Sequence, residues 1–459
     1  MRLDSWVLVV AVMLLIAWST WLGIAGIGMA PTDAASEATA FSEARSMAQG
    51  QHRFGIVQYT HYPNGPVYVL AMMVAMGLSP FQMRVFPVLV SAVALGYMSW
   101  SLCRFAGTRV HRLWVLIAAA ILAALPGLVR WQGALHEHSY ALSIVFVIVA
   151  LAAAASASRS WLFCVLGFVA GWTGYDWIPT QAAAVFVVRW LYYGNRAVDG
   201  VELALGRAAH LALLDAVRFA AGVALAILAH IGQLGLYYED LTRGARDLLG
   251  SATVRMGVDV ANAVNPEYAE WLDEEKGSAG WLARRFGQDF SLDSPARFAM
   301  IRHFFALHMV PPAHEWATFL ACLGGGAMIA LDERGRAHLG VLAVGAIPRQ
   351  LVMAAIALAG TFAACTLWVV LMPHHAVFHA HFLPRHFLAG LVLLFAMPAL
   401  LTTPAKGTGC TDDVSASALR RAYVAYSAPL ILLVLVGLYM LVSASVAARS
   451  LHGLGAGMF

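Results

Sequence analysis

Long runs of apolar residues, separated by short polar segments, dominate the pattern of this chain. The first run, Trp6–Met29, is long enough to cross the hydrocarbon core of a bilayer as a helix, which takes about 20 residues. A shorter run, Pro66–Leu78, is too brief for an ordinary span and is typical of a partly inserted helix. We therefore predict an all-α polytopic membrane protein with about eleven transmembrane helices: the first run, then 84–103, 113–129, 139–157, 161–175, 178–193, 213–237, 316–331, 351–372, 386–402 and 424–447.

The composition supports this class. Of 459 residues, 61% are hydrophobic and only 12% are charged, whereas soluble domains carry about 25% charged residues. These values exclude a soluble enzyme and a disordered chain. The net charge of +4 gives no indication of nucleic-acid binding. The five cysteines include no Cys-x-x-Cys pair, so neither a disulfide framework nor a zinc site is predicted.

The basic residues predict the orientation of the chain in the membrane. With the N-terminus in the cytoplasm, the positive-inside rule is satisfied. The predicted cytoplasmic loops are then richer in basic residues than the short loops on the other side, and they carry Arg104, Arg109, Arg112, Arg159, Arg189, Arg196, Arg207, Arg334, Arg336, Arg349, Lys406, Arg420 and Arg421.

This topology divides the chain into membrane segments and two larger extracytoplasmic loops. Most of the 17 histidines then fall on the extracytoplasmic side. We therefore expect a multi-pass protein of the inner (plasma) membrane whose polar chemistry lies on the outer face. Its parts are a first transmembrane helix (1–29), a loop with an acidic motif and short juxtamembrane helices (30–83), transmembrane helices (84–237), a second loop (238–315) and C-terminal transmembrane helices with a histidine-rich loop at 373–386 (316–459).

The first extracytoplasmic loop holds a pair of acidic residues. Asp33 and Glu37 are four residues apart, which makes them neighbours on one face of a helix. They follow directly after the first membrane helix, where a partly desolvated carboxylate suits a general base. The alternative is structural, because acidic residues also stabilise the N-terminus of a helix.

Two further extracytoplasmic segments carry candidate binding residues. His136, Glu137 and His138 form a His-x-His pattern, for which we weigh substrate contact, a metal half-site and plain interfacial polarity. Asp176 lies in the turn Gly174–Pro179 beside aromatic residues, which suits hydrogen bonding and stacking with a sugar. A simple turn explains Asp176 equally well.

The histidine-rich loop at 373–386 is the third candidate. His375 and His379 are four residues apart, and Arg385 and His386 close the loop. We favour binding of phosphate or sugar by His375, His379 and Arg385. Metal ligation and structural polarity are the alternatives.

The N-terminal region resembles a known family. The order of the first span, the acidic pair, Glu43–Gly50, the segment Tyr62–Tyr68 with its two prolines, and Arg84 at the start of the next span is similar to the GT-C glycosyltransferases. The nearest branch is the protein O-mannosyltransferase and lipid A aminoarabinose transferase type. The resemblance covers roughly 30–105. The family usually has adjacent Asp and Glu residues, whereas here Ser36 precedes Glu37.

The resemblance implies a GT-C-like fold and transfer of a sugar from a polyprenyl-phosphate donor on the extracytoplasmic face. The acceptor class stays open among a protein, a glycolipid and a polysaccharide. We favour Asp33 as the base and Glu37 as a neighbour that raises its basicity by like-charge repulsion. Arg84 is the expected phosphate contact, and His61 and Tyr62 are expected to contact substrate. The sequence identifies no definite cofactor, and a divalent metal stays open.

Two other classes compete with this interpretation. A non-catalytic or metal-binding membrane protein would use the histidines but leaves the acidic loop unexplained. A secondary transporter should show internal repeats and charged residues at mid-membrane. We find no repeat, and the polar residues gather on one side of the membrane. The glycosyltransferase hypothesis is therefore preferred.

Overall fold

The computed structural model describes the greater part of the N-terminal half and two later helices. The described residues are 2–27, 34–51, 63, 65–106, 109–135, 137–155, 159–195, 197–198, 201–202, 204–255, 349–372 and 383–401. The predicted spans 316–331 and 424–447 and most of the second extracytoplasmic loop lie outside this set.

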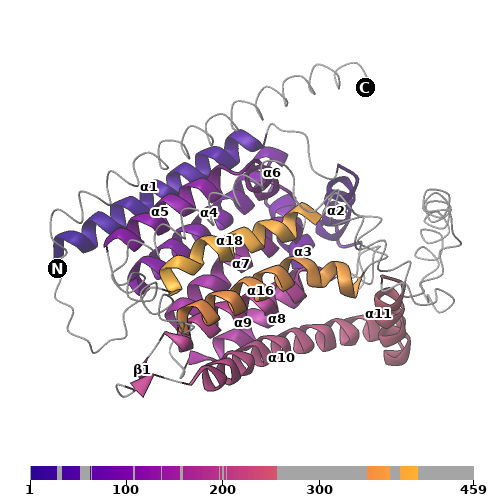
Figure 1. Cartoon of the computed structure of the whole chain (residues 1–459). Helices are drawn as coiled ribbons and strands as arrows, with labels where there is room; N and C mark the ends of the chain where they lie inside the picture. The colour runs from indigo at the N-terminus through magenta and orange to yellow at the C-terminus, as the bar shows by residue number, and fades with distance from the viewer. Residues whose placement is uncertain are drawn as a thin grey trace, which may run out of the picture.

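The described residues form a bundle of long helices that run along a common direction (Figure 1). The bundle contains α1 (Arg2–Gly26), α4 (Pro80–Phe105), α5 (Arg109–Ala124), α7 (Glu137–Ala154), α8 (Leu162–Thr173), α9 (Ile178–Gly194), α10 (Leu205–Tyr238), α16 (Arg349–Leu371) and α18 (Leu383–Leu401). Shorter helices are α2 (Ala34–Ala48), α3 (Gly65–Ala75), α6 (Pro126–Gln132) and α11 (Leu241–Arg255). Figure 1 shows α2, α3 and α11 at one end of the bundle and β1 at the opposite end. We call these the α2 end and the β1 end.

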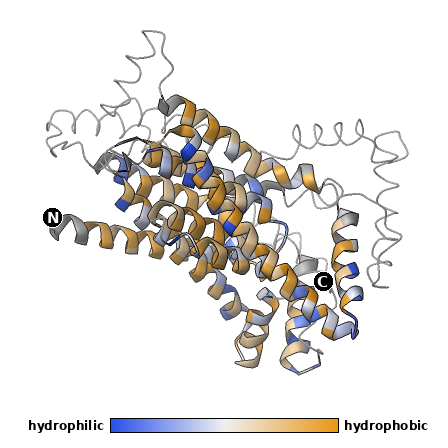
Figure 2. Cartoon of the chain, turned by 90° about the horizontal axis from the view of Figure 1, so that it is seen from below, coloured by the Kyte–Doolittle hydropathy of each residue, from blue (hydrophilic) through white to orange (hydrophobic). Residues whose placement is uncertain are grey.

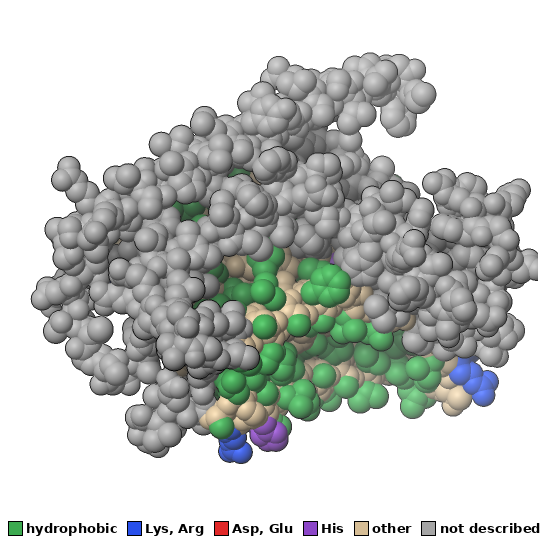
Figure 3. All heavy atoms as spheres, in the orientation of Figure 1, with side chains coloured by type: hydrophobic (Ala, Val, Ile, Leu, Met, Phe, Trp, Pro, Cys, Tyr) green, Lys and Arg blue, Asp and Glu red, His purple; other side chains and the backbone are tan. Residues whose placement is uncertain are grey.

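In the part of the chain that the structure describes, three helices are long and apolar enough to cross a membrane. They cover Trp6–Gly26, Pro80–Phe105 and Leu205–Tyr238. Other described helices have shorter apolar stretches, among them Leu162–Thr173 of α8 with 12 residues. Figure 2 shows that the bundle is hydrophobic over most of its length. Large apolar side chains of α1 and α10 are exposed on its outside, and Figure 3 shows hydrophobic side chains gathered over α10. Lipid is a suitable environment for these faces.

Capping residues and prolines determine where the helices begin and end more closely than the ends of the apolar runs do. Ser79 begins α4 with a capping box, since its side chain accepts from the Gln82 N–H and the Gln82 side chain accepts from the Ser79 N–H. The run predicted at 113–129 is broken, because Pro126 disfavours helical geometry at Leu125. The chain therefore forms α5 and α6 instead of one helix.

A small antiparallel ladder departs from the all-helical prediction. In it, β1 (Ala197–Val198) pairs with β2 (Val201–Glu202) in the connection between α9 and α10. Each strand has two residues, so the class of the described fold stays helical.

Glycine allows α8 and α10 to pack backbone against backbone. A Cβ atom at Gly167 would overlap the carbonyl oxygen of Phe219, and one at Gly222 would overlap that of Cys164. Small residues at helix interfaces permit this close approach in membranes. The contact fixes α10 against α8 along the middle of both helices.

An ion pair is buried towards the β1 end. Arg189 of α9 donates through Nε to Asp215 of α10 at 2.6 Å, and both side chains are fully buried. The guanidinium also donates to the carbonyl oxygens of Ala152 and Ala155, which end α7. The positive-inside rule predicts Arg189 in a cytoplasmic loop. The structure places it inside the bundle, because Asp215 balances its charge.

Candidate functional site

Glu37 and Arg84 form a two-pronged ion pair at the α2 end. Nη1 of Arg84 donates to Oε1 of Glu37 at 3.0 Å, and Nη2 donates to Oε2 at 2.5 Å. The Glu37 side chain is 5% exposed and that of Arg84 is 24% exposed. Two parallel charge-assisted hydrogen bonds of this kind fix the orientation of both groups.

Backbone groups after α6 complete this ion-pair site. Arg84 Nη1 also donates to the carbonyl oxygen of Gly133 at 3.0 Å, and the Leu135 N–H donates to Glu37 Oε1 at 3.2 Å. Glu37 lies in the first turn of α2, where an acid is favourable to the helix dipole. The site therefore attaches the start of α2 to α4 and to the segment that follows α6.

Apolar contacts hold α2 against α3. Ala40 and Ala44 of α2 share a buried cluster with Leu70 and Met73 of α3 and with Leu135. The two short helices thus form one unit at the α2 end. Most of the chain connecting them, including His61 and Tyr62, lies outside the described residues.

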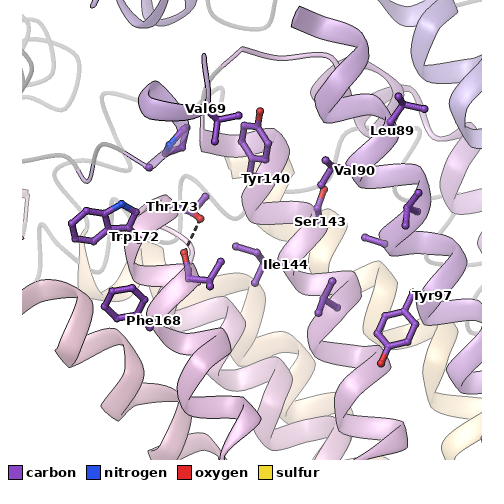
Figure 4. A pocket seen from close by; sticks show the side chains of 16 residues that line it. Val69, Leu89, Val90, Tyr97, Tyr140, Ser143, Ile144, Phe168, Trp172 and Thr173 are labelled. Carbon is purple, nitrogen blue, oxygen red and sulfur yellow. Dashed lines mark hydrogen bonds between the residues drawn. The ribbon is translucent and has the colours of Figure 1, made fainter. Parts of the chain in front are cut away.

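An apolar cavity of about 750 Å³ lies beside this unit. Its lining comes from α3, α4, α7 and α8, and Figure 4 shows Val69, Leu89, Tyr140, Phe168 and Trp172 around it. Some lining side chains of α4 and α8 are also exposed on the outside of the bundle, namely Leu89, Val93, Tyr97, Phe168 and Val169. The cavity therefore opens sideways between α4 and α8, with α7 behind it.

Polar and aromatic residues gather where α3, α8 and α10 meet. Tyr175 Oη lies 2.7 Å from His230 Nδ1, and the Trp172 ring meets the imidazole edge to face at 6.5 Å. One turn further along α10, Gln233 donates through Nε2 to Tyr68 Oη at 2.5 Å. We call these five residues the His230 cluster. Trp172 belongs both to this cluster and to the cavity wall.

A second buried histidine lies between α9, α16 and α18. The His386 ring stacks on Trp368 at 4.9 Å and lies 5.0 Å from Trp177. Thr180 donates its hydroxyl to the carbonyl oxygen of Ala364 at 2.7 Å and lies 3.1 Å from His386 Nδ1. Since the single hydroxyl proton goes to Ala364, Thr180 accepts from Nδ1–H of His386. This histidine ends the histidine-rich segment inside the bundle.

The predicted site residues fall into three groups. Glu37, Arg84 and Asp176 are described, and Asp176 is buried in the turn between α8 and α9. For Glu137, His138 and Arg385 the structure describes the backbone, at the start of α7 and of α18. The others lie outside the described residues: Asp33, His61, Tyr62, His136, His375 and His379. Among the residues that are described, no three His, Cys, Asp or Glu side chains are close enough together to hold a metal ion.

The prediction of site residues did not include His230 and Gln233. Both lie within the apolar run at 213–237, which predicts a membrane span and gives no separate motif for them. A signal was present, because polar side chains are costly inside a membrane helix and are seldom placed there without a role.

The comparisons with known proteins identify no relative. No protein-family model, curated protein or solved structure shows significant similarity to the chain.

Proposed function

We propose that this protein is a membrane glycosyltransferase that moves a sugar from a polyprenyl-phosphate donor to an acceptor at the extracytoplasmic face. The observation that supports the proposal most is the sideways-opening apolar cavity next to α2 and α3. A long isoprenoid chain needs an apolar site reached from the bilayer, and its head group needs polar residues at the membrane surface. Val69 lines the cavity and also packs against the buried cluster of α2 and α3, and the Glu37–Arg84 pair lies at the starts of α2 and α4.

The cavity suits the lipid part of such a donor. Its volume of about 750 Å³ lies within the range of about 300–1,000 Å³ that is typical of small-molecule sites. Val93 on α4 and Val169 on α8 flank its open side, while Ile144 and Val147 of α7 form its back wall. A prenyl chain would enter between α4 and α8 and leave its phosphate near α3.

Asp33 is proposed as the general base. It immediately precedes α2 in the sequence, and the start of α2 is fixed by the Glu37–Arg84 ion pair. In the transfer step, the acceptor hydroxyl gives its proton to the Asp33 carboxylate and its oxygen bonds to the anomeric carbon. The bond from that carbon to the phosphate oxygen breaks, and polyprenyl phosphate leaves with the electron pair.

The ion pair changes the roles proposed for Glu37 and Arg84. A carboxylate that accepts three hydrogen bonds, two of them from a guanidinium, is a poor source of like-charge repulsion towards Asp33. We assign Glu37 and Arg84 to positioning α2. Arg385, at the start of α18, is then the preferred cation for the leaving phosphate. A divalent metal stays an alternative source of positive charge there.

Filling the cavity tests this proposal. Val93→Trp places an indole in the cavity, and Val217→Trp places the same side chain on the outer face of α10. The two valines are 55% and 54% exposed, which makes Val217→Trp a matched control. In proteoliposomes with a polyprenyl-phosphate-sugar donor, we expect Val93→Trp to lower sugar transfer at least tenfold and Val217→Trp to leave it unchanged. Equal rates for both variants would contradict the proposed lipid site.

A further inference from the structure

Besides Asp215, α10 carries two inward-facing polar side chains nearer its C-terminal end. His230 is fully buried and Gln233 is partly buried, and both lie in the helix stretch that is long and apolar enough to cross a membrane. Ionisable and amide groups in such a helix are costly, so their presence indicates a specific task. The contacts that they make show which residues they control.

Each of these side chains orients a tyrosine from another element. His230 Nδ1 lies 2.7 Å from the hydroxyl of Tyr175, in the turn after α8, and Gln233 donates to the hydroxyl of Tyr68 on α3 at 2.5 Å. The edge-to-face contact of His230 with Trp172 fixes a third aromatic ring. Three aromatic rings from α3, α8 and the turn after α8 are thus held by one face of α10.

One of the three rings, that of Trp172, lines the apolar cavity, and Tyr68 adjoins the lining residue Val69 in the sequence of α3. Figure 4 shows the Trp172 indole at the cavity, beside Phe168 and near Val69. Gly65 of α3 also lines it, and a Cβ atom there would overlap the carbonyl oxygen of Trp172, so α3 and α8 meet at this point. Tyr68, Trp172 and Tyr175 are partly exposed, in contrast to the buried His230.

We propose that Tyr68, Trp172 and Tyr175 form the binding platform for the sugar of the lipid-linked donor, with His230 and Gln233 as positioning residues. This inference rests on the proposed function and assigns a subsite to it. A sugar ring presents an apolar C–H face that an aromatic ring covers and hydroxyl edges that neutral donors and acceptors satisfy. The five residues include no Lys or Arg, which favours the neutral sugar over its phosphate as the occupant.

Lipid binding with and without the sugar tests the platform independently of catalysis. The full-length protein in nanodiscs is titrated with a prenyl phosphate and with the same lipid carrying a hexose, and the ratio of the two dissociation constants is measured. We expect the wild type to bind the glycosylated lipid about tenfold more tightly than prenyl phosphate, because one aromatic contact stabilises a complex by roughly this factor in the dissociation constant. Trp172→Leu and His230→Leu should both bring the ratio close to one. Trp172 lines the cavity, so Trp172→Leu should also weaken binding of prenyl phosphate, whereas His230 is not among the lining residues and His230→Leu should keep that affinity within about threefold.

Two further variants separate the platform from general packing. His230→Gln keeps a hydrogen-bonding group towards Tyr175 and should retain part of the ratio. Phe168 stacks on Trp172 with centroids 6.0 Å apart and also lines the cavity, so Phe168→Leu should weaken both lipids equally. An unchanged ratio in Trp172→Leu and His230→Leu, or a wild-type ratio of one, overturns the inference and leaves the proposed function standing. If the wild type binds neither lipid, the proposed function fails and the inference fails with it.

Discussion

Arg84 of α4 holds the carboxylate of Glu37 of α2 with both terminal amino groups, across 47 residues of sequence. The same guanidinium reaches the carbonyl oxygen of Gly133, so three separate segments meet at one charge pair. The pair is mostly buried, so removing either side chain would leave the other charge buried without its partner, at a cost in folding stability. Glu37 is therefore the residue that fastens the acidic loop to the bundle.

Removing one partner of this pair should destabilise the α2 end. We expect Glu37→Gln to cost about 2 kcal/mol, less than the roughly 3–5 kcal/mol of a fully buried pair because Arg84 is partly exposed. The melting temperature of the detergent-solubilised protein measures this loss. The double variant Glu37→Gln with Arg84→Gln should lose less than the sum of the two single variants. Additive losses would show that the two side chains do not interact.

The close contact of α8 and α10 should not tolerate a methyl group. At Gly167 and Gly222 a Cβ atom would overlap backbone carbonyl oxygens, so Gly167→Ala and Gly222→Ala should each destabilise the protein by about 1–3 kcal/mol. Gly232, also on α10, has open space around its Cβ position. Gly232→Ala is therefore the control, and it should be neutral or stabilise the helix by up to about 1 kcal/mol. Similar melting temperatures for all three variants would contradict the packing described for these helices.

The buried pair of Arg189 and Asp215 should be among the most sensitive positions of the bundle. Arg189→Met leaves the Asp215 carboxylate without this partner and uncaps the end of α7, for an expected cost of about 3–5 kcal/mol. Arg218 bonds the other oxygen of Asp215 but is 45% exposed. Arg218→Gln should cost at most about 1 kcal/mol. Expression level and melting temperature distinguish the two variants, and an equal loss would argue against the central role of Arg189.

The apolar runs predicted most of the described bundle helices, because a helix with apolar surroundings on nearly all sides has few polar residues along its length. Their ends were less predictable, since Pro126 and the Ser79 cap act through local backbone geometry. The pairing of Glu37 with Arg84 had no local signal. Likewise, the sequence predicts a loop position for an arginine at the end of an apolar run, such as Arg189. Only the structure shows the buried carboxylate with which it pairs. Tertiary contacts between distant segments decide such roles, and no sequence spacing encodes them.

The predicted topology places the α2 end outside the cell and the β1 end in the cytoplasm. Single cysteines at Ser42 and at Arg159, in a cysteine-free background, test this arrangement. Both positions are exposed, Ser42 on α2 and Arg159 just before α8. Ser42→Cys should react with a membrane-impermeant thiol reagent in intact cells. Ser278→Cys, in the second predicted extracytoplasmic loop, should react in the same way. Arg159→Cys should react only after lysis. The opposite labelling pattern would move the proposed site to the cytoplasm.

The rate of sugar transfer by Asp33→Asn tests the central claim most directly. Membranes with matched amounts of wild type and variant are given a labelled polyprenyl-phosphate-sugar donor, and label in the acceptor fraction is measured. Asparagine keeps the shape of aspartate but cannot take the proton, so we expect a loss of about 10²–10⁴-fold. The melting temperature should not change, in contrast to Glu37→Gln, which should lose less activity together with stability. Normal transfer by both Asp33→Asn and Glu37→Gln would contradict the glycosyltransferase account of this loop.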